Sequence, residues 1–451
     1  MPELDPAHQH DQFCPLVGCH RGTKTAAIVP LAPLPALPVP PAGPSLWELL
    51  SGLSTEANLV YESSTDLCTQ VASLCGRALA PAINLDTSLP GVPSPLSGGH
   101  RGSIPASPYH LLHAMGQTIR GQSILPPPLS RFSGHWAVVA YLSCFRPPAP
   151  PPTPIELRLS PYANALRGRQ RAIWSEAVAI GVADFLTERS LEAGATASQL
   201  LDVDGGWLKW AIDAKLVTHL EPKRRPDYLA VRYTPGGPEI LAIECKGRNG
   251  ARKSGIRGLA NAMDQATSVG PAAFPVRHWS VAAACSRNNG GTWHPQVVEA
   301  ISAPAAPLPD HDLATATSAL ERLQNAQLLE AIGDIRLAHR LLPLDERGTQ
   351  EDPAMPADRQ RDDQDRGYLG WTLRITFGTH TLDVFLGIDE QIRTALTDGS
   401  VAQAGALRRQ RAVEVRERSE GAPNGYLHVH QPDGGEASLS AQGTLLSIRA
   451  R

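Results

Sequence analysis

The clearest pattern of apolar and polar positions lies between residues 155 and 300. Residues 171–190 (RAIWSEAVAIGVADFLTERS) carry apolar side chains at helical spacing and predict a strong amphipathic helix. A second helix is expected from Ile256 to Val269. Leu241, Ala242 and Ile243 are apolar on both faces of their strand, which is typical of a central strand covered by helices on both sides. The strands expected around these helices are 227–234, 239–246 and 277–285. The pattern therefore indicates a three-layer α/β core.

The residues before this core predict a mostly helical region. Apolar positions from Leu67 to Leu79 form one helical stripe, and a second helix is expected from Ser107 to Gly121. Residues 136–145 (WAVVAYLSCF) are continuously apolar and are interpreted as a buried strand.

The residues after the core predict helices and then alternating strands. A helical stretch covers 313–342, and the polar run 346–366 is interpreted as an exposed linker. Two strands are expected within 368–387, then a helix over roughly 389–417, and a closing hairpin that turns at 432–435.

Proline-rich and polar segments divide the chain. The organisation that we expect is a proline-rich, disordered segment at 1–44, an accessory mostly helical domain at 45–146, the α/β domain at 155–300, a helical connector at 313–345, a polar linker at 346–366 and a C-terminal α+β domain at 367–451.

Composition limits the class of protein. The net charge of −3 and pI near 6.6 give no overall basic signal for nucleic acid, so any such surface is local. Seven scattered cysteines argue against a disulfide framework and for a reducing compartment. The apolar segment 27–43 contains six prolines, so it is expected to be neither a membrane span nor a signal sequence. We expect a cytoplasmic protein.

Two acids and a lysine mark the hairpin between residues 227 and 246. Asp227 follows Pro226 at the start of the first strand, and Glu244 and Lys246 lie near the end of the second. Side chains two residues apart in a strand share a face, so Glu244 and Lys246 are expected side by side, with Cys245 on the core face. Two carboxylates and the backbone carbonyl of Cys245 suit Mg²⁺, for which Mn²⁺ can substitute. Such a site is suited to phosphodiester hydrolysis.

This Pro-Asp, turn, Glu-x-Lys pattern resembles the PD-(D/E)xK superfamily of restriction-endonuclease-like nucleases. The resemblance covers roughly 170–290 and implies a mixed sheet flanked by helices. It also implies that Asp227 and Glu244 hold the metal and that Lys246 is the catalytic lysine. Family members often carry a further acid on the preceding helix, where Glu176 lies between Ile173 and Ile180, and a glutamine on the following helix, where Gln265 lies. The tyrosine that commonly follows that glutamine is Val269 here, which speaks against the exonuclease subgroup.

A local excess of positive charge surrounds the hairpin. Between residues 223 and 257 there are nine basic and three acidic side chains, a local charge of +6. The side chains that we expect to meet phosphates without reading sequence are Arg248, Arg252, Lys253 and Arg257.

Together these features predict a Mg²⁺-dependent DNA endonuclease, with defence against foreign DNA as a natural role. Two alternatives stay open: a nuclease-like module that binds nucleic acid or protein without cutting, and a nuclease subunit that needs a partner. The sequence leaves open whether the substrate is DNA or RNA, which target is recognised, whether attack is at an end or internal, and whether the chain forms a homo-oligomer.

Overall fold

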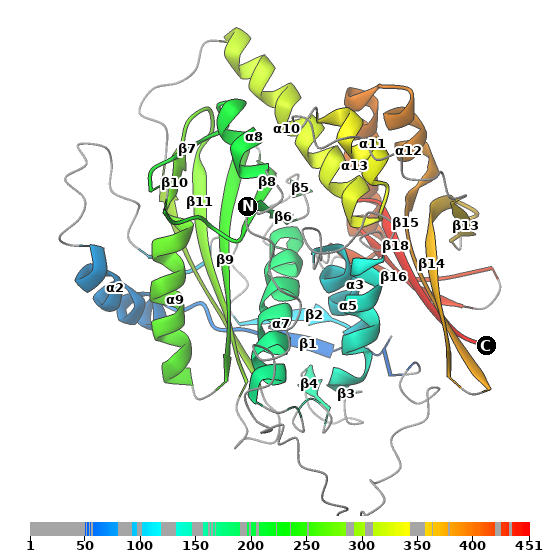
Figure 1. Cartoon of the computed structure of the whole chain (residues 1–451), viewed down its shortest axis with the longest axis horizontal. Coiled ribbons are helices and arrows are strands. Elements are labelled where there is room, and N and C mark those ends of the chain that lie inside the picture. Colours follow the sequence, from blue (N-terminus) through cyan, green and yellow to red (C-terminus); the bar gives the residue numbers. More distant parts are fainter. Residues whose placement is uncertain are drawn as a thin grey trace, which may run out of the picture. The chain divides into compact units, whose positions relative to one another are not determined.

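The protein is described from a computed structural model (Figure 1). The structure describes residues 50, 52–53, 55, 57–79, 93–96, 102–118, 132–146, 157–160, 163, 166, 168–189, 196–197, 200–203, 207–221, 223–234, 236–249, 252–285, 293–302, 310–342, 357–362, 364–377, 379–419, 425–432 and 435–451. They belong to one unit, Pro44–Arg451, and the predicted segment 1–44 lies outside them. Within these residues the protein is a mixed α/β structure with several sheets.

A six-stranded mixed sheet carries the predicted hairpin. Its order is β12-β11-β9-β8-β5, and β6 also pairs with β8. Strands β9 and β11 are parallel and the other pairs are antiparallel. The strands are β5 (Thr196–Ala197), β6 (Leu201–Asp202), β8 (Tyr228–Thr234), β9 (Gly237–Asn249), β11 (Val276–Cys285) and β12 (Trp293–Ser302). The three strands predicted from the sequence are present. Strand β12 was not predicted, because Pro295 is a signal against a strand; a proline is tolerated here because β12 is at the edge of the sheet.

Two helices cover the two faces of this sheet (Figure 1). Helix α9 (Arg252–Ala266) connects the parallel strands β9 and β11, as such a pair requires. The imidazole of His278 in β11 contacts the Ala266 carbonyl of α9 at 3.0 Å, so α9 lies on the face that also carries Glu244 and Lys246. Helix α7 (Gly168–Arg189) packs on the opposite face. Its first half has an exposed side that includes Ile173 and Glu176, but from Gly181 to Glu188 it is buried all round, so the predicted amphipathic pattern holds only in the first half.

The described residues of the N-terminal part form two small antiparallel pairs and three α-helices. Helix α2 packs on α9, while α3 lies against both α5 and α7. These elements are β1 (Ala57–Val60), α2 (Thr65–Leu79), β2 (Ser103–Ala106), α3 (Pro108–Thr118), α5 (Ser133–Tyr141), β3 (Phe145–Arg146) and β4 (Arg158–Leu159). A short helix, α8 (Trp207–Asp213), precedes the pair β7 (Val217–His219) and β10 (Val269–Pro271).

The strand predicted at 136–145 is wrong. Residues Ser133–Tyr141 form α5, and a 3-10 turn follows at Leu142–Cys144. A short run that is apolar on every side fits a buried helix as well as a buried strand. The helix packs tightly on α3: Gly134 lies so close to Gly116 that a Cβ on Gly134 would come within 2.1 Å of the Gly116 carbonyl oxygen.

A second six-stranded sheet, of order β13-β14-β15-β18-β17-β16, forms the C-terminal part. Its strands are β13 (Asp358–Arg361), β14 (Gly367–Phe377), β15 (His380–Asp389), β16 (Tyr426–His430), β17 (Glu436–Ser440) and β18 (Thr444–Ala450). The helices of this part are α10 (Asp310–Ala331), α11 (Ile335–Leu341), α12 (Glu390–Thr397) and α13 (Val401–Arg418). The closing hairpin is therefore a three-stranded meander, and the helix expected at 389–417 is two helices.

The linker predicted at 346–366 is wrong where the structure describes it. Strand β13 pairs with β14, and Asp362 is fully buried. The Asp362 carboxylate accepts hydrogen bonds from the backbone N–H groups of Gln364 and Arg366, which fixes the turn into β14. A polar sequence is ordered here because its polar groups bond to one another.

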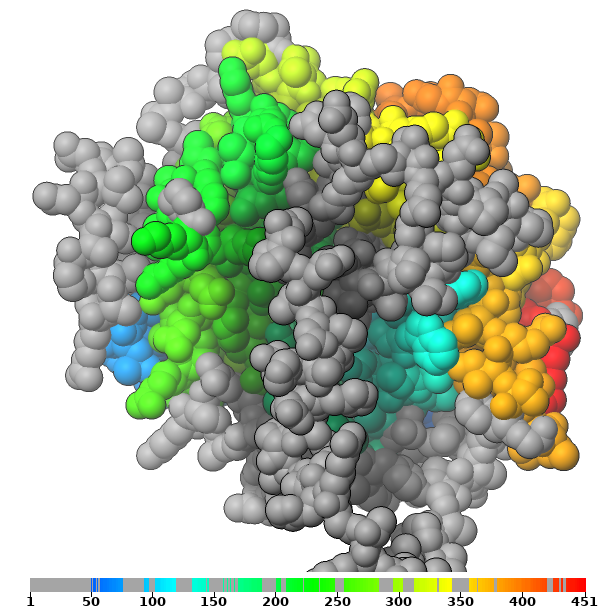
Figure 2. Space-filling model, in the orientation of Figure 1, coloured from blue at the N-terminus to red at the C-terminus, as the bar shows by residue number. Residues whose placement is uncertain are grey.

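The segments that the sequence divides share one hydrophobic core. It includes Leu111 of α3, Phe185 of α7, Ile243 of β9, Leu320 of α10 and Val384 of β15. The His135 imidazole of α5 contacts the Trp371 carbonyl of β14 at 2.9 Å, and Figure 2 shows the cyan surface of the N-terminal helices directly beside the orange surface of β14. The domain limits remain predictions, but their contents pack together.

A buried polar network joins α7 to the C-terminal sheet. The Tyr426 hydroxyl donates to Asp184 Oδ2 at 2.7 Å and accepts from Gln117 Nε2 at 2.9 Å. Gln442 Nε2 donates to Glu188 Oε1 at 2.7 Å. Helix α7 therefore contacts both six-stranded sheets.

The helices within the described part of the chain include none with the length and apolar character needed to cross a membrane.

Candidate active site

The β8–β9 hairpin brings Asp227 and Glu244 together. The last residue pair of this ladder is Tyr228 with Ile243, so Asp227 and Glu244 come next on the two strands. The Asp227 N–H donates to Glu244 Oε2 at 2.8 Å, and the Cys245 N–H donates to Asp227 Oδ2 at 2.9 Å. The Val203 N–H donates to the Asp227 carbonyl at 3.1 Å. Each carboxylate is thus fixed by the backbone of the opposite strand.

Lys246 lies beside Glu244 on the same face of β9. Its ammonium donates to Glu244 Oε1. The Glu244 side chain is fully buried, whereas Lys246 keeps 25% of its side-chain surface exposed. The Lys246 side chain is therefore bound to a buried carboxylate and is at the same time partly accessible to solvent.

Burial and the charge of Asp227 raise the pKa of the neighbouring acid Glu244 to about 8, although Lys246 and the Asp227 N–H act in the opposite direction. Burial opposes protonation of Lys246, but its hydrogen bond to Glu244 and the charges of Glu244 and Asp227 raise its pKa. The site therefore concentrates negative potential around one ammonium group.

Glu176 lies within electrostatic range of these residues. Burial and the charge of Asp227 raise the pKa of Glu176, and the charge of Lys246 lowers it. The side chain is exposed, and Ile173 one turn earlier is 56% exposed. Glu176 is thus at a solvent-facing edge of the site.

Gly247 sets how closely α7 approaches this strand. A Cβ on Gly247 would lie 2.2 Å from the Glu176 backbone nitrogen and 2.6 Å from Ser175 Oγ. Only glycine permits this contact, which places the backbone of Glu176 directly against the residue after Lys246. The sequence reading did not single out Gly247, and its position next to the Glu-x-Lys pattern was the available signal.

Ser280 is a second residue that the sequence reading missed. It is directly opposite Glu244 in the parallel β9–β11 pair, so their side chains share a face. Its hydroxyl is fully buried and makes no hydrogen bond within the described part of the structure. No sequence motif indicated Ser280, because its position opposite Glu244 depends on how the strands pair.

Cys245 is a core residue, as predicted. It is 1% exposed, and burial raises the pKa of its thiol well above the ordinary value, so it is a poor nucleophile.

Within the described part of the structure, no hydrogen bond or ion pair joins the Gln265 side chain to the hairpin residues, and its place in the site stays a prediction. Gln265 is at the C-terminal end of α9, next to Ala266, which contacts His278. His278 is opposite Ala242, four residues along β9 from Lys246, a distance on the order of 13 Å.

The basic residues after the hairpin are partly described. Arg248 belongs to β9, and Arg252 and Lys253 to the first turn of α9, but their side chains lie outside the described part. Arg257 is exposed on α9.

The donor set suits a hard cation through two carboxylates rather than a closed cage. Within the described ranges, no group of three histidine, cysteine, aspartate or glutamate side chains is close enough to hold a metal ion. Asp227, Glu244 and the Cys245 carbonyl supply oxygen atoms, which Mg²⁺ or Mn²⁺ prefers, and Mg²⁺ retains water when few protein ligands bind it. The raised pKa values of Glu244 and Glu176 fit a site that would bind positive charge.

Comparisons of the chain with protein-family models, with curated proteins and with solved structures found no match.

Proposed function

We propose that the protein is a metal-dependent nuclease that hydrolyses phosphodiester bonds of DNA. The observation that carries this proposal is the reciprocal arrangement of Asp227 and Glu244, with the Lys246 ammonium on the second carboxylate. A Glu/Lys pair on an ordinary surface hairpin would be solvated, whereas this Glu244 is fully buried. Burying a carboxylate has a high cost in free energy, so a functional role is the simpler explanation.

The local architecture supports a restriction-endonuclease-like fold. An antiparallel hairpin leads through a crossover helix into a parallel strand, and a second helix covers the opposite face. That order of elements is the one that the PD-(D/E)xK resemblance implies. Fold alone does not determine activity, so the case for chemistry depends on the hairpin residues.

Each residue of the site has a proposed task. Asp227 and Glu244, with the Cys245 carbonyl, would hold Mg²⁺ or Mn²⁺, and Glu176 would stand beside them. The bound cation would supply charge neutralisation and an activated water. The Lys246 ammonium would donate hydrogen bonds to a phosphate oxygen as negative charge builds there.

The test is a cleavage assay of the purified protein with supercoiled plasmid, linear DNA and RNA. Each substrate is incubated with Mg²⁺, with Mn²⁺ or with EDTA. We expect the protein to cut circular DNA only when a metal ion is present. Asp227→Asn and Lys246→Met should each abolish this cutting. Lys209→Met is the control, because Lys209 forms an exposed ion pair with Asp213. This variant should cut DNA as the unchanged protein does.

The same assay separates the alternatives. DNA binding that survives both substitutions, with no cutting by the unchanged protein, would indicate a binding module. Cutting that appears only when a cell extract is added would indicate a subunit that needs a partner.

A further inference from the structure

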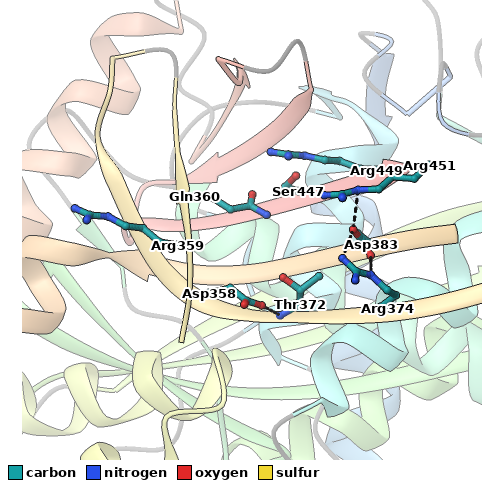
Figure 3. Close-up of a pocket in the computed structure, with 9 residues that line it drawn as sticks. All are labelled: Asp358, Arg359, Gln360, Thr372, Arg374, Asp383, Ser447, Arg449 and Arg451. Carbon is teal, nitrogen blue, oxygen red and sulfur yellow. Dashed lines mark hydrogen bonds and ion pairs between the residues drawn. The ribbon is translucent and has the colours of Figure 1, made fainter. Parts of the chain in front are cut away.

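A polar pocket of about 410 Å³ lies on the C-terminal sheet, away from the proposed catalytic residues (Figure 3). Strands β13, β14, β15 and β18 supply its walls, and Arg451 follows β18. The lining residues are Asp358, Arg359, Gln360, Thr372, Arg374, Asp383, Ser447, Arg449 and Arg451. Four arginines and two aspartates are thus among the lining residues, and none of the nine is apolar or aromatic.

Asp383 organises the arginines at one end of this pocket. Arg374, Asp383 and Arg449 are directly opposite one another on β14, β15 and β18. Arg374 donates to both Asp383 oxygens, at 2.6 and 3.0 Å, and Arg451 Nε is 3.1 Å from Oδ2. The Arg374 hydrogen bonds, with the charges of Arg451 and Arg449, hold the pKa of Asp383 below its ordinary value despite partial burial.

The arginines are fixed at one edge yet face solvent. The exposed fractions of the side chains are 61% for Arg374, 63% for Arg451 and 53% for Arg359. A guanidinium has five N–H donors, so its pairing with one carboxylate leaves further donors for a ligand. Figure 3 shows Arg374 and Arg451 on either side of Asp383, with Arg359 at the opposite end of the pocket.

The shape of the site favours a repeated anion over a single small one. The four strands span three strand spacings, about 14 Å. Phosphates of one nucleic-acid strand recur about every 3.4 Å along the helix axis, so such a span faces several of them. None of the described lining residues is apolar or aromatic, so the site favours contacts to phosphate and sugar, which carry no sequence information.

We propose that this arginine pocket binds the phosphate backbone of a nucleic-acid strand. The proposed function supplies the identity of the polyanion, while the donors and their spacing come from the sheet itself. The pocket is then a second contact for the substrate, carried by a different sheet from the catalytic hairpin.

The test measures DNA binding without cleavage. A labelled duplex is titrated with the full-length protein in EDTA, with fluorescence anisotropy at several salt concentrations between about 50 and 200 mM NaCl. The double variant Arg449→Gln, Arg451→Gln keeps the Arg374–Asp383 pair. We expect binding about tenfold weaker at the lower salt, and a slope of log K against log salt smaller by about 2, equally for duplexes of different sequence.

The matched control is Arg393→Gln, Arg409→Gln, which also removes two ion-paired arginines but none that line the pocket. It should leave the slope unchanged. If the first variant unfolds, Arg359→Gln takes its place, since that side chain is half exposed. An unchanged slope, an equal loss in the control, or tighter binding of polyglutamate than of DNA would overturn the proposal.

The binding experiment and the cleavage assay can refute their two proposals independently. Metal-dependent cutting with no effect of the pocket arginines on binding would overturn only the pocket. Arginine-dependent binding without cutting would support the pocket and refute the nuclease.

Discussion

Replacing Gly247 by alanine tests whether a close contact between α7 and β9 builds the candidate site. The new Cβ would lie 2.2 Å from the Glu176 backbone nitrogen and 2.6 Å from the Ser175 carbonyl carbon. Both atoms belong to the backbone of α7, so no side-chain rotation relieves the clash. To reach the shortest ordinary contact of 3.4 Å, the helix must retreat by about 1.2 Å.

The expected effect on stability follows from this displacement. Overpacking a core typically costs about 1–3 kcal/mol, and a clash with backbone belongs at the upper end. The alanine also restricts the unfolded chain, which returns about 0.4–1 kcal/mol. We therefore expect the free energy of unfolding to fall by about 2 kcal/mol. A shift of about 1 Å in a catalytic geometry can lower the rate about a hundredfold, so cleavage per folded molecule should fall as well.

Urea unfolding followed by tryptophan fluorescence measures the first effect, because Trp174 of α7 and Trp279 of β11 are both buried at this contact layer. Amide hydrogen exchange in α7 reports the helix itself. Gly236→Ala is the control: it lies in the turn of the same hairpin, where a Cβ meets nothing closer than Thr234 Oγ1 at 3.6 Å. A Gly247→Ala protein as stable as this control, with unchanged exchange in α7, would refute the reasoning.

Three further predictions concern buried polar groups. Tyr426→Phe should lower the free energy of unfolding by about 2–3 kcal/mol, because it leaves Asp184 and Gln117 without their shared hydroxyl; unaltered urea melting would contradict this. Ser280→Ala should raise stability by about 1 kcal/mol, because it removes an unpaired buried hydroxyl; a loss of stability in the same assay would mean that the hydroxyl has a partner. Burial lowers the pKa of His278 to about 4, while the unfolded chain takes up that proton near pH 6.5. Stability is then fully present above pH of about 6.5 and is lost as pH falls toward 4, by about 1.4 kcal/mol at pH near 5.5 for this one histidine. His278→Gln should flatten the decline of thermal stability with acid by that amount, and an equally steep decline would show that His278 does not contribute.

Local patterns in the sequence predicted the hairpin well. Asp227, Glu244 and Lys246 are brought together because a two-residue period and a turn determine which side chains share a face, and both are visible in the chain itself. The core position of Cys245 followed from the same period.

Contacts between distant segments were not predictable in this way. Residues 133–141 form a helix that meets α3 closely at Gly134 and Gly116, and nothing in their own periodicity shows that contact. Asp362 looked like part of a solvated linker, yet its carboxylate closes a turn beneath Tyr368. The opposition of Ser280 and Glu244 depends on pairing between parallel strands, which sequence spacing does not reveal.

The buried hydrogen bonds from α7 to the C-terminal sheet limit how this protein could change in evolution. A shorter descendant that lost residues 367–451 would leave Asp184 and Glu188 facing water on a helix that otherwise fills a core, with no Tyr426 or Gln442 to meet them. Transfer of the β8–β9 hairpin and helix α7 to another protein would therefore need this distant sheet as well, or substitutions at both acids.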